Sequence, residues 1–237
     1  MKQLHFVVQA KGGVGKSLLT YLLGLSNHSN EDSLFVDVDS STQTSSRQLK
    51  FLGEHRTETL SLLNDKEVLV RDKFIAYLES LADTPFQNIY FDFGAPESEQ
   101  LPALIERDLP FKEFLDELDF EAHFYLVVGG GGAYASSVEY FQKMMKVLGN
   151  DFYVAVWKSI TTFNNFPLLA QELERNCHKL QIPLRQFGDF EPSSNLGSQI
   201  LSGIRLGYAL NDYQTGARLA LKKELKQNFG YEQSTSR

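Results

Sequence analysis

The chain has 237 residues, of which 42% are hydrophobic and 22% charged, as expected of a globular domain with a large core. Its formal charge of −7 excludes a general electrostatic attraction to nucleic acids or anionic membranes, so any such binding needs a local basic patch. The single cysteine, Cys177, excludes an internal disulfide. Because we find neither a secretion signal nor an apolar run of about 20 residues, we expect a cytoplasmic protein without a membrane span.

Strand-like apolar runs alternate with helical segments along the whole chain. The predicted strands cover residues 4–9, 34–37, 89–92, 124–128, 152–157 and 184–187. The predicted helices cover residues 18–27, 71–82, 99–118, 136–148, 167–180, 198–208 and 215–229. This alternation is typical of α/β proteins and predicts one domain, residues 1–237, built on a doubly wound, mostly parallel sheet with helices on both faces. Such sheets bind ligands at the carboxyl ends of their strands.

A glycine-rich segment, Gln9-Ala10-Lys11-Gly12-Gly13-Val14-Gly15-Lys16-Ser17, joins the first predicted strand to the first predicted helix. A strand, a glycine-rich turn ending in Lys-Ser and a helix together predict a phosphate-binding loop for a nucleotide. The backbone N–H groups from Gly12 to Leu18 would surround the phosphates, and the helix dipole would add to their effect. Lys16 would reach the β- and γ-phosphates of ATP, and the Ser17 hydroxyl would bind Mg²⁺.

Aspartates follow two other predicted strands. One strand ends in Phe91-Asp92, the Walker B pattern, in which the carboxylate holds Mg²⁺, usually through a water molecule. The strand at residues 34–37 runs into Asp37-Val38-Asp39. For Asp37 two interpretations stay open, a role in the site and a cap on the following helix. All three carboxylates belong to the edge of the sheet that carries the phosphate loop.

A second lysine, Lys11, stands directly before Gly12-Gly13, and this arrangement resembles the deviant phosphate-loop ATPases of the ParA/MinD family. The resemblance implies a Mg²⁺-dependent ATPase that forms a homodimer around ATP. It further implies that Lys11 contacts the partner's ATP, that Lys16 contacts the chain's own ATP, and that Asp39 positions or activates the attacking water. The chain departs from the family at Ala10, where the usual pattern has glycine, and at Ser40, where the family has proline.

Two further motifs resemble one branch of this family. The sequence Asp92-Phe93-Gly94-Ala95 and the strand ending in Val156-Trp157 are similar to TraL/StbB-like proteins of conjugative and mobilisable plasmids. This similarity implies a process such as plasmid partition, mobilisation or conjugative transfer. Where the family has an asparagine that contacts adenine, this chain has Lys158-Ser159, and we assign no residue to the base.

Other segments leave two interpretations open. The glycine run at residues 129–132 permits the close approach of a ligand or a partner, or forms a mobile connection. An acidic stretch at residues 97–121 suits a solvated helix face or a surface for a protein partner. What we call the C-terminal basic patch suits either non-specific DNA binding by a dimer or an ordinary solvated face. Its members are Arg205, Arg218, Lys222, Lys223 and Lys226.

Two alternatives to a DNA-associated ATPase remain. A metabolic ligase of the dethiobiotin-synthetase type would share the fold and use ATP to activate a carboxylate, although Lys11 argues against it. An ATP-gated adaptor would bind a protein partner through its acidic helices and hydrolyse ATP only when that partner stimulates it.

Overall fold

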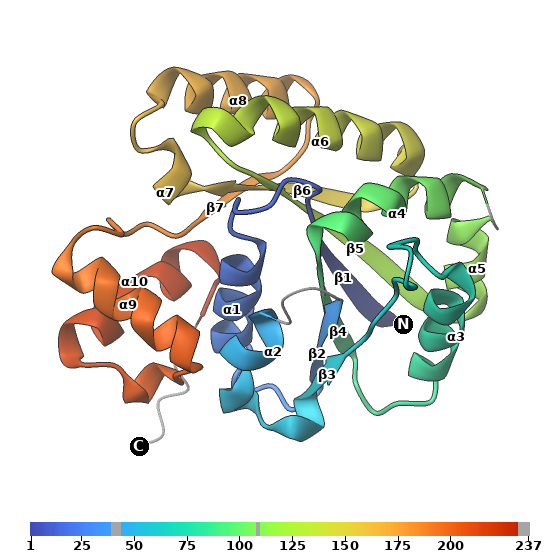
Figure 1. The fold of residues 1–237 in the computed structure, drawn as a ribbon, viewed down its shortest axis with the longest axis horizontal. Helices are drawn as coiled ribbons and strands as arrows, with labels where there is room; N and C mark the ends of the chain where they lie inside the picture. Colours follow the sequence, from blue (N-terminus) through green and yellow to red (C-terminus); the bar gives the residue numbers. More distant parts are fainter. Residues whose placement is uncertain (39–43, 108–109, 232–237) are drawn as a thin grey trace.

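The computed structural model describes residues 1–38, 44–107 and 110–231. Its centre is a single sheet of seven parallel strands in the order β3-β2-β4-β1-β5-β6-β7 (Figure 1). The strands are β1 (Lys2–Val8), β2 (Ser33–Val38), β3 (Thr57–Thr59), β4 (Asn88–Phe93), β5 (Phe120–Val128), β6 (Tyr153–Ser159) and β7 (Leu184–Phe187). The prediction of an α/β fold with a mostly parallel sheet is therefore confirmed.

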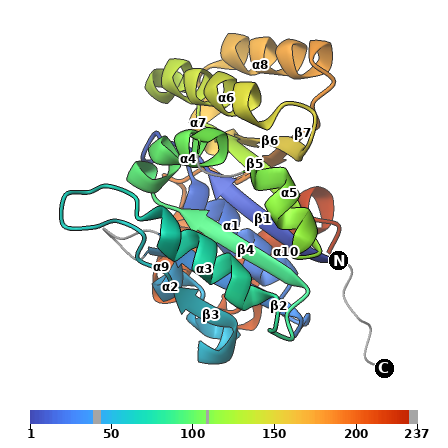
Figure 2. The same ribbon diagram turned by 90° about the vertical axis from the view of Figure 1, so that its right-hand side faces the viewer.

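Helices connect the strands and lie on both faces of the sheet (Figures 1 and 2). The α-helices are α1 (Lys16–Ser26), α2 (Thr44–Gln48), α3 (Arg71–Leu81), α4 (Ala95–Arg107), α5 (Phe111–Glu117), α6 (Tyr134–Leu148), α7 (Ile160–Phe163), α8 (Pro167–Lys179), α9 (Asn195–Leu206) and α10 (Thr215–Asn228). Four short 3₁₀ turns are η1 (Lys50–Leu52), η2 (Glu54–Arg56), η3 (Gly131–Ala133) and η4 (Leu210–Asp212). Among the described residues, no helix is both long enough and apolar enough to cross a membrane.

The first strand occupies the middle of the sheet, where β1 pairs with β4 on one side and with β5 on the other. The register places Val7 beside Asp92 of β4, and Val8 beside Leu126 of β5. Because all strands are parallel, their carboxyl ends share one edge. The segment after β1 therefore lies between the segments that follow β4 and β5.

Two apolar cores form because alternate residues of each buried strand point to opposite faces. On one face Phe6 stacks on Phe91 and Phe124, with ring centroids 5.0 and 4.9 Å apart, and α3, α4, α5, α6 and α8 cover these rings. On the other face α1, α9 and α10 cover a core that includes Val7 and Trp157. This second core fixes the C-terminal helices beside the helix that follows the phosphate loop.

Besides the short helix α7, which no predicted element covers, the predicted elements differ from the observed ones in three places. The helix predicted at residues 99–118 is wrong as a single helix, since α4 ends at Arg107 and α5 begins at Phe111 after Pro110. Proline lacks an N–H group and disfavours helical conformation in the residue before it, which explains the break. The edge strand β3 has only three residues, Thr57–Thr59, and short α2 is polar, so neither carries an apolar period.

Candidate functional site

The predicted phosphate loop forms a turn that requires glycine. Gly13 and Gly15 have φ angles of 76° and 102°, in the left-handed region that other residues avoid. Gly12 and Gly13 are exposed, whereas Val14 is buried and Leu18 is half-buried. Gly15 caps α1 without any side-chain hydrogen bond, and the first turn of α1 holds no acidic residue. The loop thus presents backbone N–H groups and a positive helix end to an anion.

Lys16 is almost fully buried, with 9% of its surface exposed. Its Nζ donates a hydrogen bond of 2.9 Å to the backbone oxygen of Gln9, at the start of the loop. The ammonium group therefore lies within the curve of the loop. Lys11 is instead exposed, and its backbone N–H donates to Oε1 of Gln9 at 3.1 Å. The two lysines thus have different environments, one facing inward and one facing solvent.

Gln9 anchors the loop in the core, a role that the sequence did not reveal. Its side chain is fully buried, and Nε2 donates to the backbone oxygens of Val127 and Ser137, at 2.7 and 3.3 Å. Its backbone N–H donates to Oγ of Ser98 at 3.2 Å. One residue therefore connects the phosphate loop to β5, α6 and α4.

Asp92, at the end of β4, is buried beside the loop. Burial raises the pKa of its carboxyl to about 6, while the neighbouring hydroxyls of Ser45 and Ser17 and the charge of Lys16 act in the opposite direction. The Ser45 hydroxyl donates to Oδ2, and Oδ1 has no hydrogen-bond partner among the described residues. A buried oxygen without a partner, next to the Ser17 hydroxyl, is a donor set that fits Mg²⁺, which binds few protein oxygens and keeps several waters.

The structure gives Asp37 a capping role. Its Oδ2 accepts hydrogen bonds from the backbone N–H and the hydroxyl of Ser46, at 2.7 and 2.9 Å, and so holds the start of α2. Asp39, the predicted catalytic carboxylate, lies outside the described residues. The structure therefore brings Lys16, Ser17 and Asp92 together, with Lys11 at the exposed side of the same loop.

The glycine run after β5 packs against the site from within the chain. A Cβ atom on Gly129 would lie 2.9 Å from Cγ1 of Val14 in the phosphate loop. One on Gly130 would lie 2.4 Å from the backbone oxygen of Thr162, in α7. Of the two interpretations, close approach applies to these two glycines, and the approaching groups belong to the same chain.

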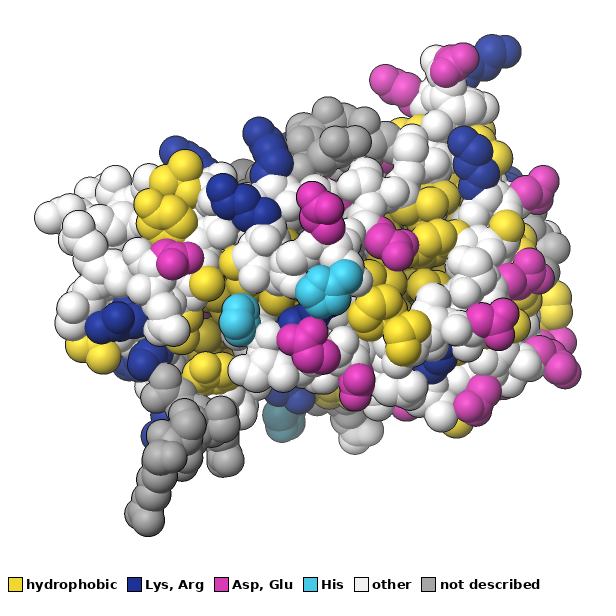
Figure 3. Space-filling view, turned by 90° about the horizontal axis from the view of Figure 1, so that it is seen from below, with side chains coloured by type: hydrophobic (Ala, Val, Ile, Leu, Met, Phe, Trp, Pro, Cys, Tyr) yellow, Lys and Arg dark blue, Asp and Glu magenta, His cyan; other side chains and the backbone are white. Residues whose placement is uncertain are grey.

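The C-terminal basic patch lies on α9 and α10, away from the acidic helices. Arg205, Lys223 and Lys226 are exposed, and Arg218 and Lys222 are half-buried. Figure 3 shows the face of the molecule that lies at the bottom of Figure 1. On the half of this face where α9 and α10 lie, Lys and Arg side chains gather, whereas Asp and Glu side chains lie mostly on the other half. Because Glu224 is buried against the N–H groups of Gly188 and Asp189, it does not offset the exposed charge at the surface.

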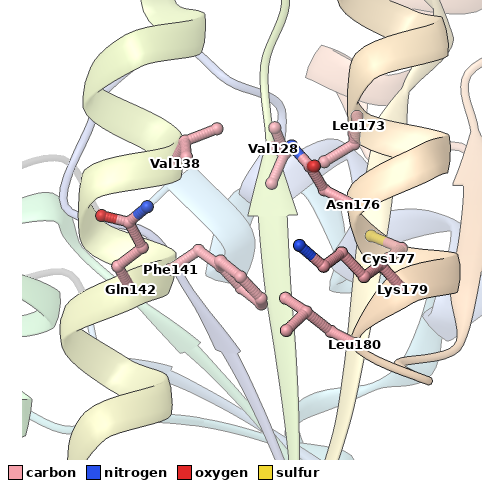
Figure 4. Close-up of a pocket in the computed structure, with 9 residues that line it drawn as sticks. All are labelled: Val128, Val138, Phe141, Gln142, Leu173, Asn176, Cys177, Lys179 and Leu180. Atoms are coloured by element: carbon pink, nitrogen blue, oxygen red, sulfur yellow. The ribbon is translucent and has the colours of Figure 1, made fainter.

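A separate hollow of about 250 Å³ lies between α6 and α8, and Figure 4 shows Phe141 and Leu180 on its two sides. Cys177 also lines this hollow, and burial raises the pKa of its thiol to about 11, so the thiol stays protonated at neutral pH. This agrees with Cys177 acting as a small apolar residue. None of the predicted site residues lines this hollow.

The parallel sheet and the glycine-rich loop between its central strand and α1 define the fold of P-loop NTPases. Comparison with solved structures makes this more specific, because the similar chains have the ParA/MinD-like fold. A chain of the MinC:MinD cell division protein complex of Aquifex aeolicus has a TM-score of 0.54 and 14% identity, over 100% of this chain and 99% of that chain. The MinD cell division protein of Aquifex aeolicus gives 0.52 and 15%, over 100% of both chains.

A ParA family ATPase of Chlorobium tepidum gives a TM-score of 0.52 and 13% identity, over 96% of this chain and 100% of that chain. No family model matches the sequence, and no curated protein matches it. The chain therefore has the fold of ParA/MinD-like P-loop ATPases. Assignment to the plasmid TraL/StbB-like branch stays a prediction from two short motifs.

Proposed function

We propose that this protein is a Mg²⁺-dependent ATPase that forms a homodimer around ATP and acts as a nucleotide-dependent switch. The observation that carries the proposal is the phosphate loop itself. It has two left-handed glycines and a buried lysine inside its curve, and beside its Ser17 lies Asp92, whose Oδ1 has no hydrogen-bond partner among the described residues. The ParA/MinD-like fold supports the same conclusion.

Each residue has a defined task in this mechanism. Lys16 would exchange the backbone oxygen of Gln9 for the β- and γ-phosphates, and backbone N–H groups at the start of α1 would hold the phosphate oxygens. Ser17 and Asp92 would hold Mg²⁺, which would supply positive charge next to the phosphates. Lys11 extends into solvent and reaches the ATP of the partner protomer, where it stabilises the transferred phosphoryl group. Asp39 orients the attacking water.

Nucleotide binding and dimerisation are tested together with two lysine variants. Sedimentation with ATP and Mg²⁺ is expected to show a dimer of the unchanged protein. Lys16→Ala is expected to lose ATP binding, because it removes the cation inside the loop. Lys11→Ala is expected to bind ATP as a monomer and to form no dimer. Lys73→Ala, which removes an exposed charge from α3, is the matched control.

Dimerisation of Lys11→Ala equal to that of the unchanged protein would exclude a role for Lys11 across the interface. A monomer that binds ATP and hydrolyses it only with a small carboxylic acid would instead support the ligase alternative. Sedimentation measures dimerisation, and the release of phosphate from ATP measures hydrolysis.

The biological process we propose is DNA partition, mobilisation or conjugative transfer, with DNA bound by the C-terminal basic patch of the dimer. A dimer doubles the phosphate contacts, so binding should be strong with ATP and should weaken as salt rises. The test uses an Asp39→Ala variant, designed to slow hydrolysis, with ATP and with ADP across a salt series. A dimer that binds no DNA would favour the adaptor alternative, in which a protein partner contacts the acidic helices.

A further inference from the structure

A surface hollow with two arginines opens between α2 and the end of α9. Its volume is about 360 Å³, and it is lined by Thr44, Arg47, Gln48 and Arg205. Both arginines are exposed, and within the described ranges neither has a carboxylate at ion-pair distance. No acidic residue is among the described residues that line it. Within the part of the chain that the structure describes, two positive charges therefore face the same cavity without a neutralising partner.

Tight packing between the two helices brings these arginines together. Gly207, directly after α9, has a φ angle of 67°, and a Cβ atom there would lie 2.6 Å from the backbone oxygen of Arg47. The same Cβ would lie 2.6 Å from Cγ of Lys50. Only glycine permits this approach, since the backbone is left-handed and the space is already filled. The end of α9 thus lies directly against the segment that carries Arg47.

Side-chain hydrogen bonds and one buried residue hold the short helix α2 in place. A helix of five residues is not stable by itself. Here Ser45 donates to Asp92, Ser46 donates to Asp37, and Leu49 is buried just beyond the helix end. These anchors fix the backbone at Arg47, so less conformational freedom is lost when its side chain binds a ligand.

We propose that Arg47 and Arg205 together bind one phosphate group of a nucleic-acid backbone. The guanidinium group has a planar set of N–H donors that matches the oxygens of a phosphate. The amide of Gln48 adds a neutral polar group to the same cavity. This inference rests on the proposed DNA-binding function and adds to it a contact outside α10, on the segment next to the nucleotide site.

Nucleic acid is favoured over a free phosphate compound by what surrounds the hollow. Helix α10, whose Lys223 and Lys226 are exposed, packs against α9 and extends the positive surface. In Figure 3 the Lys and Arg side chains over α9 and α10 cover an area larger than one phosphate group would contact. A nucleic-acid backbone offers a continuous row of phosphates, so one molecule can contact both the hollow and α10.

The test measures binding of a fluorescein-labelled DNA duplex by anisotropy, with a slowly hydrolysed ATP analogue and Mg²⁺, across a salt series. Arg47→Ala and Arg205→Ala are each expected to raise the Kd about tenfold. Each is also expected to reduce the slope of log Kd against log salt by about 0.9, the value for one phosphate contact. The double variant is expected to weaken binding by less than the product of the single effects, because both arginines hold the same phosphate.

Lys73→Ala, with the same change in net charge on α3, is expected to leave the Kd unchanged. If Arg47→Ala behaves like Lys73→Ala while the unchanged protein binds DNA, the hollow is not a phosphate site, but the proposed function stands. Fully multiplicative effects in the double variant would overturn the shared site. If the unchanged dimer binds no DNA, this inference and the proposed DNA role both fail, whereas ATP-dependent dimerisation is judged separately by sedimentation.

Discussion

Substitution of Gly130 by alanine is expected to disturb the packing between the end of β5 and α7. Gly130 has a φ of −88° and a ψ of −176°, an extended backbone that alanine adopts without strain. The added methyl group would lie 2.4 Å from the backbone oxygen of Thr162 and 2.9 Å from Cγ of Phe163. Any effect of Gly130→Ala is therefore steric and does not come from backbone conformation.

The size of the effect follows from these distances. Ordinary contact begins at 3.4 Å, so the backbone of Thr162 must move by about 1 Å. Such overpacking costs about 1–3 kcal/mol. The movement also strains the hydrogen bond from the Gly130 N–H to Oγ1 of Thr162, which is 2.8 Å long and contributes about 1 kcal/mol. Reduced freedom of the unfolded chain stabilises the variant by about 0.5 kcal/mol, so the net loss is about 2.5 kcal/mol.

Gly132→Ala is the matched control, because the same glycine run has no atom within 4 Å of a Cβ at Gly132. We expect the free energy of unfolding of this variant to equal or slightly exceed that of the unchanged protein. Urea denaturation of the three proteins, followed by circular dichroism, measures the difference. Equal unfolding free energies for Gly130→Ala and Gly132→Ala would refute the close approach between β5 and α7.

Three further predictions concern buried polar side chains. Burial lowers the pKa of His5 to about 3, so below pH 6.5 the unfolded chain binds a proton that the folded protein does not. The free energy of unfolding therefore decreases as the pH is lowered. Between pH 8 and pH 5 this loss is about 2 kcal/mol, and urea titrations should show it reduced in His5→Phe. Gln9→Leu is expected to lower the unfolding free energy by about 2 kcal/mol, because it breaks three hydrogen bonds, one of which is long at 3.3 Å, and to weaken ATP binding in calorimetry; unchanged affinity would contradict the anchoring role. Arg56→Met is expected to cost about 3 kcal/mol in thermal unfolding, since three backbone oxygens lose their donor, and a smaller loss than in Gln9→Leu would contradict this ranking.

The sequence predicts the elements with strong periodicity and the motif with fixed spacing. All six predicted strands are present, and β7 begins and ends at the predicted residues 184–187. The loop from Gly12 to Ser17 and the carboxylate of Asp92 meet at one edge, because parallel strands place their carboxyl ends together. These features depend on the local periodicity of apolar residues, on the spacing within the motif, and on the rule that parallel strands end at the same edge of the sheet.

What the sequence does not predict are contacts between residues far apart in the chain. The bond from Gln9 to Val127 spans 118 positions, and that from Ser45 to Asp92 spans 47. Glutamine and serine at such positions carry no periodic signal, so only the folded structure identifies their partners. The break before α5 coincides with Pro110, but Pro102 lies inside α4, so the presence of a proline does not by itself mark where the helix ends.

The central place of β1 has a consequence for the order of folding. The first strand of the chain pairs with β4 and β5, which begin at Asn88 and Phe120. Closing loops of this length is entropically costly, and such long-range pairing slows folding. The side chain of Gln9 finds its acceptors only when Val127 and Ser137 are in place. The phosphate loop, although it lies at residues 9–17, can therefore reach its binding conformation only after the chain has been synthesised past Ser137.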